Sequence, residues 1–356
     1  MFEIHRALWA STQARTQATT RAITLAAALA TGFIGPAAAQ TIEWKFSHWV
    51  PPTHPLQKIY TDWAKSIEQK TGGTLKIAIF PAQQLGKAPD HYDMVTKGIA
   101  DAAYISTGYQ AGRMLVTNAG QMPFLIGNAE GGSMALDEWY RPYAAKDMPG
   151  VKLCFMFTHD VATLHSKKEI RTPDQIKGMK IRPAHATMGN WMTSLGATTV
   201  QVSAPESREA LERGVADAIT FPWGSLMNFK IDGIVKFHID EPMYVATFAT
   251  IINQDRYNAL NAQQKKVLDE HCTTQFAGQV GRDWAKWEDD GRQKIKAAGS
   301  GHTVVKLKPD ELAAWKKSAE PVYRSWAEDM KKSGYDADKV MGDLKQALTR
   351  HKALAN

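Results

Sequence analysis

The chain of 356 residues is long enough to form two domains with cores of their own, and its composition, 44% hydrophobic and 22% charged, is that of a globular protein. Its net charge of +7 is spread along the chain without basic clusters interleaved with aromatic residues, so nucleic acid is not an expected partner. The mild positive charge favours anionic small solutes, though weakly.

The first forty residues have the pattern of a secretory signal. Three arginines precede an apolar run at residues 23–34, and an alanine triplet at 37–39 offers an A-x-A cleavage site. We therefore predict that residues 1–39 are a signal peptide and that the mature chain lies in the periplasm. A membrane anchor is the weaker alternative, because the apolar run is too short to span a bilayer comfortably. Removal of three arginines and one glutamate would lower the net charge from +7 by two, to +5.

The segment that follows the predicted signal peptide alternates strand and helix patterns. Residues 41–47 alternate like a strand, a helix with apolar positions at 3.6-residue spacing comes next, and residues 75–80 have the pattern of a second strand. This β-α-β order predicts a parallel pair joined by a right-handed crossover. A helix over 129–146 and a buried strand over 151–157 are predicted beyond it.

One unit occurs twice at identical spacing. Ala88-Pro89-Asp90 is followed eight residues later by Gly98-Ile99-Ala100-Asp101-Ala102, and Ala204-Pro205-Glu206 is followed in the same way by Gly214-Val215-Ala216-Asp217-Ala218. Both copies predict a helix start with proline in the first turn, a glycine stop and a strand. The repeat predicts two similar α/β lobes with a cleft between them.

The second half of the chain repeats this strand and helix pattern and then becomes helical. Residues 261–298 contain few helix breakers and predict either one long helix across both lobes or two helices. The other predicted elements are strands at 179–182, 216–221, 234–239 and 244–253 and helical segments at 309–332 and 337–355.

The two cysteines could oxidise in an exported protein. Cys154 lies in a strand pattern and Cys272 in a helix pattern, each among apolar neighbours. That setting favours two separately buried thiols over a disulfide.

Common catalytic signatures do not occur. The sequence has no G-x-S-x-G, no Walker A loop, no G-x-G-x-x-G and no H-E-x-x-H, and its eleven histidines lack metal-ligand spacing. His48 and His54 flank Trp49 but no carboxylate follows at a suitable distance, so neither a metal nor another cofactor is predicted. His159 and Asp160 could form an acid/base pair, although a histidine at a strand end more often only makes a hydrogen bond.

A cation and several aromatic residues are predicted at the carboxyl ends of strands, which is where open α/β sheets bind ligands. Apolar walls with one bidentate donor are typical of a carboxylate pocket, and the planar guanidinium suits two carboxylate oxygens better than lysine does. The candidate residues are Trp49, Tyr109, His159, Arg182, Phe221 and Trp223.

At these residues the chain resembles the solute receptors of TRAP transporters, the tripartite ATP-independent periplasmic importers. The resemblance covers nearly all of the mature chain in order and spacing, and it is carried by FPAQQLG at 80–86, the Gly98-to-Asp101 unit, PDQIKGMKIRP at 173–183 and ALERGVAD at 210–217 with Pro222. It implies a two-lobed, periplasmic-binding-protein-like α/β fold with hinge strands and a long bridging helix. It also implies a receptor that binds an organic anion and delivers it to a membrane permease. We expect the protein to be a monomer.

The resemblance assigns the carboxylate-binding arginine of the family to Arg182. Receptors of this family for sugar acids carry a second arginine where this chain has Ala162, a glutamate where it has Ser106, and asparagines near Trp49 and Phe221. Aromatic walls therefore replace polar contacts, and Ser106 joins the candidate ligand-binding residues.

The lobe boundaries follow from these assignments. Lobe I is predicted to comprise residues 40–157 plus 247–285, and lobe II residues 158–246 plus 286–356 with the C-terminal helices. The hinge crossings are expected near Phe157-Thr158 and Ala246-Thr247.

The predicted function is a periplasmic receptor for a monocarboxylate with an aromatic or bulky apolar body, with 2-hydroxy and 2-oxo acids as the favoured subclass. Three alternatives remain open: a secreted enzyme that acts on a small organic acid through His159 and Asp160, the same receptor serving C4-dicarboxylates, and a receptor that reports to a sensor kinase.

Overall fold

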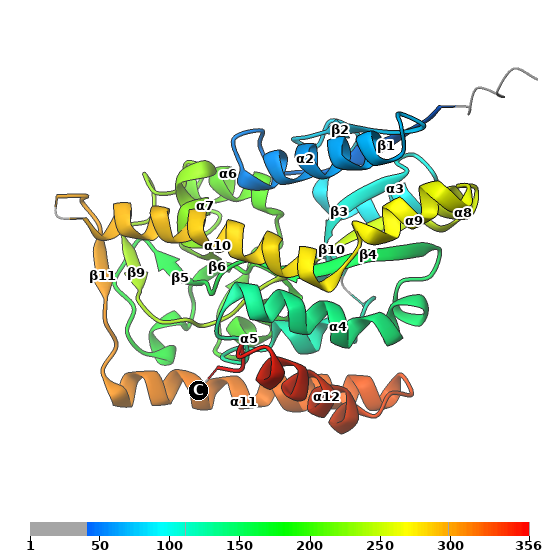
Figure 1. The fold of residues 1–356 in the computed structure, drawn as a ribbon. Helices are drawn as coiled ribbons and strands as arrows, with labels where there is room; N and C mark the ends of the chain where they lie inside the picture. The colour runs from blue at the N-terminus through cyan, green and yellow to red at the C-terminus, as the bar shows by residue number, and fades with distance from the viewer. Residues whose placement is uncertain (1–40, 111, 298, 356) are drawn as a thin grey trace, which may run out of the picture. The chain divides into compact units, whose positions relative to one another are not determined.

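A computed structural model describes residues 41–110, 112–297 and 299–355 of the chain. The predicted signal peptide at 1–39 lies outside the described residues. From residue 42 to residue 355 the described chain forms two mixed sheets with helices packed around them, which is the predicted two-lobed α/β fold (Figure 1). We call the part built on the first sheet lobe I and the part built on the second sheet lobe II. The exact boundaries predicted for the two lobes stay predictions.

The first sheet has five strands in the order β2-β1-β3-β10-β4. Strands β1, β2 and β3 run parallel, whereas β10 runs antiparallel to both of its neighbours. The parallel β1–β2 pair joined by a helix is the β-α-β unit predicted from the sequence. The bounds are β1 Ile42–Ser47, β2 Leu75–Phe80, β3 Ala102–Ser106, β4 Val151–Thr158 and β10 Thr247–Asn253.

The second sheet has six strands in the order β11-β9-β5-β8-β6-β7. Strands β6, β7 and β8 are parallel, and β5 is antiparallel to β8 and to β9. Counted from the β7 edge, the five strands β7-β6-β8-β5-β9 therefore have the same sequence of parallel and antiparallel directions as the five strands of the first sheet. The bounds are β5 Thr163–Ser166, β6 Lys180–Arg182, β7 Thr198–Thr199, β8 Ala218–Phe221, β9 Phe237–Ile239 and β11 Thr303–Val305.

The repeated sequence unit occupies equivalent places in the two sheets. Each copy forms a short 3-10 turn, a six-residue helix (α3 His91–Thr96 and α6 Ser207–Glu212), a glycine with positive φ and a strand. The aspartates of both copies make the same bond, since Asp101 accepts the backbone N–H of Lys45 at 2.8 Å and Asp217 that of Lys180 at 3.0 Å. Both glycines, with φ of 71° and 69°, adopt a left-handed conformation that favours glycine.

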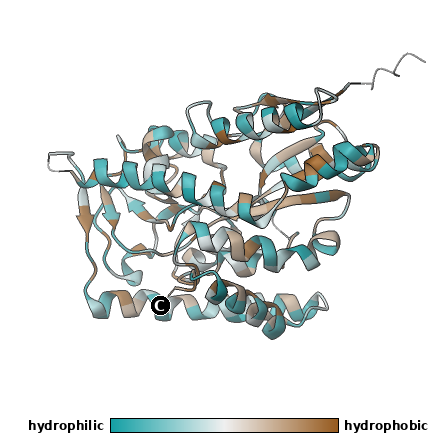
Figure 2. Cartoon of the chain, in the orientation of Figure 1, coloured by the Kyte–Doolittle hydropathy of each residue, from teal (hydrophilic) through white to brown (hydrophobic). Residues whose placement is uncertain are grey.

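The remaining helices surround the sheets. They are α2 Pro55–Lys70, α4 Ala129–Asp147, α5 Ala186–Ser194, α7 Trp223–Asn228, α8 Gln254–Asn258, α9 Ala262–Glu270, α10 Thr274–Lys296, α11 Pro309–Lys332 and α12 Ala337–Arg350, with 3-10 turns at η1 Ala88–Asp90, η2 Thr107–Tyr109, η3 Thr117–Gln121, η4 Pro173–Ile176 and η5 Ala204–Glu206. In Figure 2 strand β4 is coloured largely as hydrophobic, whereas the outer faces of α10 and α11 carry mostly hydrophilic colours. This is the pattern of sheets buried beneath amphipathic helices.

The breaker-poor segment 261–298 forms two helices, α9 and α10, and the longer one bridges the lobes. Thr273 accepts the backbone N–H of Phe276 and so caps the start of α10. From there α10 packs against α4 of lobe I and α7 of lobe II (Figure 1). A Cβ atom on Gly291 would lie 2.2 Å from the Cα of Gly224, so the approach of α10 to α7 requires glycine.

The expectation of two separate thiols is wrong, because Cys154 and Cys272 form a disulfide. Both residues are buried, as their apolar neighbours indicated. The pairing depends on tertiary structure, since the turn between α9 and α10 lies on β4, 118 residues away in sequence. No local pattern shows that contact.

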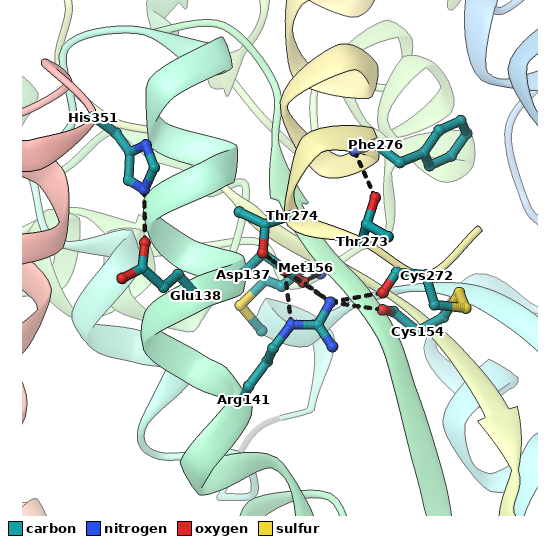
Figure 3. Close-up of polar contacts among 10 residues, drawn as sticks. All are labelled: Asp137, Glu138, Arg141, Cys154, Met156, Cys272, Thr273, Thr274, Phe276 and His351. Atoms are coloured by element: carbon teal, nitrogen blue, oxygen red, sulfur yellow. Dashed lines mark hydrogen bonds and ion pairs between the residues drawn. A yellow bond between two sulfur atoms is a disulfide. The ribbon is translucent and has the colours of Figure 1, made fainter. Parts of the chain in front are cut away.

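A polar cluster lies beside this disulfide (Figure 3). Arg141 donates to the carbonyl oxygens of both cysteines, at 3.1 and 3.0 Å, and pairs with Asp137 at 2.8 Å. Asp137 also accepts from the backbone N–H of Met156 and from the hydroxyl of Thr274. Burial raises the pKa of Asp137 although Arg141 opposes the shift. The start of the bridging helix is therefore fixed to both α4 and β4.

The C-terminal helices contact both lobes. Trp315, near the start of α11, donates to the carbonyl oxygen of Arg171, whereas Trp326, near its end, donates to that of Leu115. Helix α12 packs against α4 of lobe I, and its α-helix ends at Arg350 rather than at 355. Within 41–110, 112–297 and 299–355 no helix is long and apolar enough to cross a membrane.

Candidate functional site

A cavity lies where the strand ends of the two sheets face the bridging helix. It contains about 410 Å³ of space free of protein atoms, part of it open to solvent. Its lining is largely apolar and aromatic: Trp49, His54, Ser106, Tyr109, His159, Arg182, Ala184, Ala204, Phe221, Pro222, Ser225, Phe229, Ala246, Phe248 and Trp284. Six of the seven candidate residues from the sequence are in this set, and Trp223 is not.

Arg182 is the charged group of the cavity. It is the last residue of β6 and only 1% of its surface is exposed. Its guanidinium donates to the carbonyl oxygens of Val202 at 3.0 Å and Thr220 at 3.5 Å, and it lies 5.5 Å from the ring of Phe221. No carboxylate among the described residues pairs with it. Because a buried charge without a counter-ion is costly, this arrangement favours an anionic ligand.

Tyr109 places a second donor beside this guanidinium. Its hydroxyl oxygen accepts from Arg182 at 3.2 Å and from the backbone N–H of Ala204 at 2.9 Å. Both bonds use the oxygen as acceptor, so the hydroxyl proton is left to donate elsewhere. A carboxylate at Arg182 could accept from the guanidinium and from this hydroxyl together. Tyr109 follows β3 in lobe I, so the same contact joins the two lobes.

Aromatic rings form most of the remaining wall. Trp49 follows β1 and stacks on Tyr104 at 5.1 Å between ring centroids, with Tyr109 at 6.0 Å. Phe248 of β10 lies 6.5 Å from Trp49, and Trp284 of α10 lies 5.2 Å from Phe248. Such a wall offers a flat apolar ligand both contact area and favourable ring geometry.

His159 lines the cavity with both ring nitrogens already engaged. Its Nδ1 lies against the carbonyl oxygen of Asp160, and its Nε2 accepts the backbone N–H of Ala246 at 3.1 Å. Burial lowers the pKa of His159 to about 4, so the ring is neutral and carries its proton on Nδ1. Neither nitrogen is left to act on a bound molecule, which removes the geometric basis for the acid/base pair of His159 and Asp160.

Trp223 lies away from the cavity. It is the first residue of α7, and its ring packs edge-on against His165 at 5.0 Å and beneath the guanidinium of Arg292 at 5.6 Å. His165 in turn bonds His238, and His238 bonds His302. Strand β8 ends at Phe221, and Trp223 follows Pro222 as the first residue of α7. The side chain of Trp223 therefore packs within lobe II.

Several lining residues were not among the candidates from the sequence. Phe248 and Trp284 come from elements far along the chain, and their patterns indicate only core positions. His54 lies in the same segment as Trp49, and its sequence context suggests at most a metal ligand. Its Nδ1 caps α2 by accepting the N–H of Leu56 at 3.3 Å, and a histidine before a proline-led helix is the one local signal that could have drawn attention to it.

A buried carboxylate supports the cavity wall from behind. Glu288 of α10 accepts from the backbone N–H of Ser225 at 2.9 Å, from its hydroxyl, and from the indole N–H of Trp284 at 2.8 Å. Ser225 and Trp284 both line the cavity, so Glu288 fixes their orientation. Burial raises the pKa of Glu288 to about 7. The described residues contain no group of three or more histidine, cysteine or acidic side chains arranged to hold a metal ion.

Several solved structures with this fold hold aromatic acids, and others hold β-D-glucuronate or pyroglutamate. A TRAP solute-binding protein of Rhodoferax ferrireducens with copurified benzoate is 27% identical, with a TM-score of 0.83, over 88% of this chain and 99% of that one. A TRAP periplasmic solute-binding protein of Bordetella bronchiseptica with bound (R)- and (S)-mandelate is also 27% identical, with a TM-score of 0.80, over 87% and 99%. The C4-dicarboxylate-binding periplasmic protein DctP of Rhodobacter capsulatus is 23% identical over 82% of this chain and 89% of its own length.

The family model for bacterial extracellular solute-binding proteins of family 7, DctP, matches residues 46–329. These proteins bind solutes and are not enzymes, which confirms that prediction for this chain. The protein belongs to the DctP family of TRAP-transporter solute-binding proteins.

Proposed function

We propose that this chain is a periplasmic receptor for an aromatic monocarboxylate, which it delivers to the membrane permease of a TRAP transporter. The observation that carries the proposal is Arg182, a buried guanidinium without a carboxylate partner among the described residues, at the wall of an aromatic cavity. Arg182 and Tyr109 would hold the two carboxylate oxygens. Trp49, Phe221, Phe248 and Trp284 would enclose the ring.

An aromatic body fits this wall better than a polar one. A ring enclosed by Trp49, Phe248 and Trp284 gains contact area and about 0.5–1.5 kcal/mol for each favourable ring pair. The relatives from Rhodoferax ferrireducens and Bordetella bronchiseptica, which hold benzoate and mandelate, agree with this ligand class. Mandelate is a 2-hydroxy acid, and the hydroxyl of Ser106 in the cavity wall supports 2-hydroxy and 2-oxo acids as a subclass.

A single carboxylate fits better than two. Among the described residues, Arg182 is the one arginine or lysine that lines the cavity, and Ala162 lies elsewhere, fully buried beside Tyr244. A second carboxylate enclosed here would lose its hydration without a cationic partner, and each unpaired group would cost about 1–3 kcal/mol or more. We therefore favour a monocarboxylate over the C4-dicarboxylates named for the Rhodobacter capsulatus relative.

Ligand capture would close the two lobes. Tyr109 contacts Arg182 and Ala204 across the cavity, and Asn228 of lobe II donates to Thr53 of lobe I at 2.9 Å. Such contacts form only when the lobes are together. We place the hinge at the two crossings of 157–158 and 246–247, where β4 ends and β10 begins, because Thr158 pairs there with Thr247. A ligand that touches both lobes favours the closed state through its differential contacts.

The direct test is mass spectrometry of the small molecule that copurifies with the protein when no ligand is added. An aromatic monocarboxylate released on denaturation supports the proposal. A released dicarboxylate, sugar acid or amino acid contradicts it. Conversion of the added acid into a product during incubation would contradict a receptor role altogether.

A further inference from the structure

Three residues of lobe I that line the candidate site each carry a polar side-chain atom without a hydrogen-bond partner among the described residues. They are Trp49, His54 and Ser106, which are 5%, 2% and 2% exposed. The indole Nε1 of Trp49 is buried without a partner among the described residues. The Nε2 of His54 and the hydroxyl of Ser106 keep some accessible surface and also make no hydrogen bond within the described part of the chain. A buried polar group is nearly always paired in folded proteins, so the unpaired indole of Trp49, together with two further unpaired groups at the same cavity, indicates a ligand group that completes them.

The positions of the protons on Trp49, His54 and Ser106 determine which kind of ligand group could pair with them. The Nδ1 of His54 accepts the backbone N–H of Leu56, so the neutral ring carries its proton on Nε2 and presents a donor there. Burial lowers the pKa of His54 to about 3, which agrees with a neutral ring. The indole N–H of Trp49 can only donate. Ser106 can donate or accept. The set therefore requires an acceptor on the ligand.

The same wall offers nothing to a positively charged group. Within the part of the chain that the structure describes, no aspartate or glutamate lines the cavity. Glu288 lies behind it, and three donors from Ser225 and Trp284 already occupy its oxygens. An ammonium group placed against Trp49 and His54 would meet two donors instead of acceptors. A second anion would meet donors but no cation.

We propose that Trp49, His54 and Ser106 form a second polar subsite, which takes an uncharged hydrogen-bond acceptor on the aromatic body of the ligand, such as a hydroxyl, ether or carbonyl oxygen. The subsite disfavours an amino group at that place. This inference rests on the proposed function, because Arg182 in lobe II must hold the carboxylate. A ligand with both groups then bonds both lobes, so the acceptor contributes to closure as well as to selectivity.

The test compares ligands and variants in one calorimetric grid. The ligands are benzoate, its hydroxy- and methoxy-derivatives at each ring position, and the corresponding aminomethylbenzoates. The variants are Trp49→Phe, which keeps an aromatic ring and loses the N–H, and His54→Asn, which keeps an acceptor for the N–H of Leu56 and loses the distant ring donor. Tyr104→Phe is the matched control, because Tyr104 also has an unpaired buried hydroxyl next to Trp49 but does not line the cavity.

The measured quantity is the ratio of the affinity for the best acceptor-bearing ligand to the affinity for benzoate. One uncharged hydrogen bond corresponds to a ratio of about 2 to 12 in the wild-type protein. This ratio should fall toward one in the double variant Trp49→Phe/His54→Asn and remain unchanged in Tyr104→Phe. The aminomethylbenzoates should bind the wild-type protein more weakly than benzoate does. Loss of ring contact affects both ligands alike and cancels from the ratio.

Two kinds of negative result can be told apart. An unchanged affinity ratio in the double variant, or preferential binding of an aminomethylbenzoate, overturns the subsite. The proposed function still stands in that case if benzoate binds and its binding depends on Arg182. Failure of every aromatic acid to bind the wild-type protein overturns both.

Discussion

Replacement of Arg182 by alanine tests the anchor of the proposed site. The guanidinium is 1% exposed and makes three hydrogen bonds, to Val202, Thr220 and Tyr109, so it is held in place before the ligand arrives. Losing a charged hydrogen-bond pair costs about 1.5–3 kcal/mol, and a carboxylate left buried without a partner costs more. The affinity for an aromatic acid should therefore fall at least ~10-fold. Arg182→Lys should recover only part of it, because an ammonium cannot donate in a bidentate fork.

The assay is isothermal calorimetry, with a fold check by circular dichroism. Arg292→Ala is a suitable control, because Arg292 also lies over an aromatic ring, that of Trp223, but pairs with Asp240 and does not line the cavity. That variant should bind almost as the wild-type protein does. Near wild-type affinity in folded Arg182→Ala would refute the assignment of the anchor.

Three further predictions concern the bridging helix, the disulfide and the hinge. Burial raises the pKa of Glu288 from 4.5 to about 7, so the folded state holds its proton more tightly than the unfolded state and this group favours folding below pH 4.5, an advantage lost as the pH rises through 7. The resulting loss in the free energy of unfolding amounts to about 3 kcal/mol at most. Urea unfolding measured from pH 5 to 8 should show a weaker pH dependence for Glu288→Gln than for the wild-type protein. The same pH dependence in both proteins would contradict this role of Glu288. Reduction of the Cys154–Cys272 bond, which closes a loop of 118 residues in sequence, should lower the free energy of unfolding by about 2–5 kcal/mol, and unchanged urea midpoints with and without reductant would contradict this. Saturating ligand should decrease the radius of gyration in small-angle scattering, whereas identical profiles would remove lobe closure from the mechanism.

The sequence was sufficient for those features that are encoded locally. The repeated helix-glycine-strand unit is visible because proline in a first turn, a glycine at the helix end and an aspartate before a strand lie close together in the chain. Arg182 could be identified because it ends a short strand, where open sheets bind ligands. Those two signals are enough to predict two lobes and an anion between them.

The features that the sequence did not show depend on contacts between distant segments. Cys154 and Cys272 both have the neighbours of buried residues, and only the packing of the α9–α10 turn on β4 pairs them. The helical spacing of Trp284 indicates only a core residue, and its place in the cavity wall depends on the path of α10 past the cavity. The sequence predicts Trp223 beside Phe221 in the site, but α7 begins at Trp223 and the side chain packs within lobe II. Predicted strand 234–239 forms a strand only at 237–239, because residues 231–235 make turns that close on Ile231.

A thermal-shift panel at equal ligand concentration tests most directly whether the site is an aromatic monocarboxylate pocket. Ligand at ~100 times its dissociation constant adds about 2.7 kcal/mol to the stability of the folded state, which a melting curve detects readily. We expect benzoate, mandelate or their close relatives to raise the melting temperature of the wild-type protein and to have no effect on Arg182→Ala. A shift with succinate, malate or a sugar acid, and none with the aromatic acids, would contradict the account.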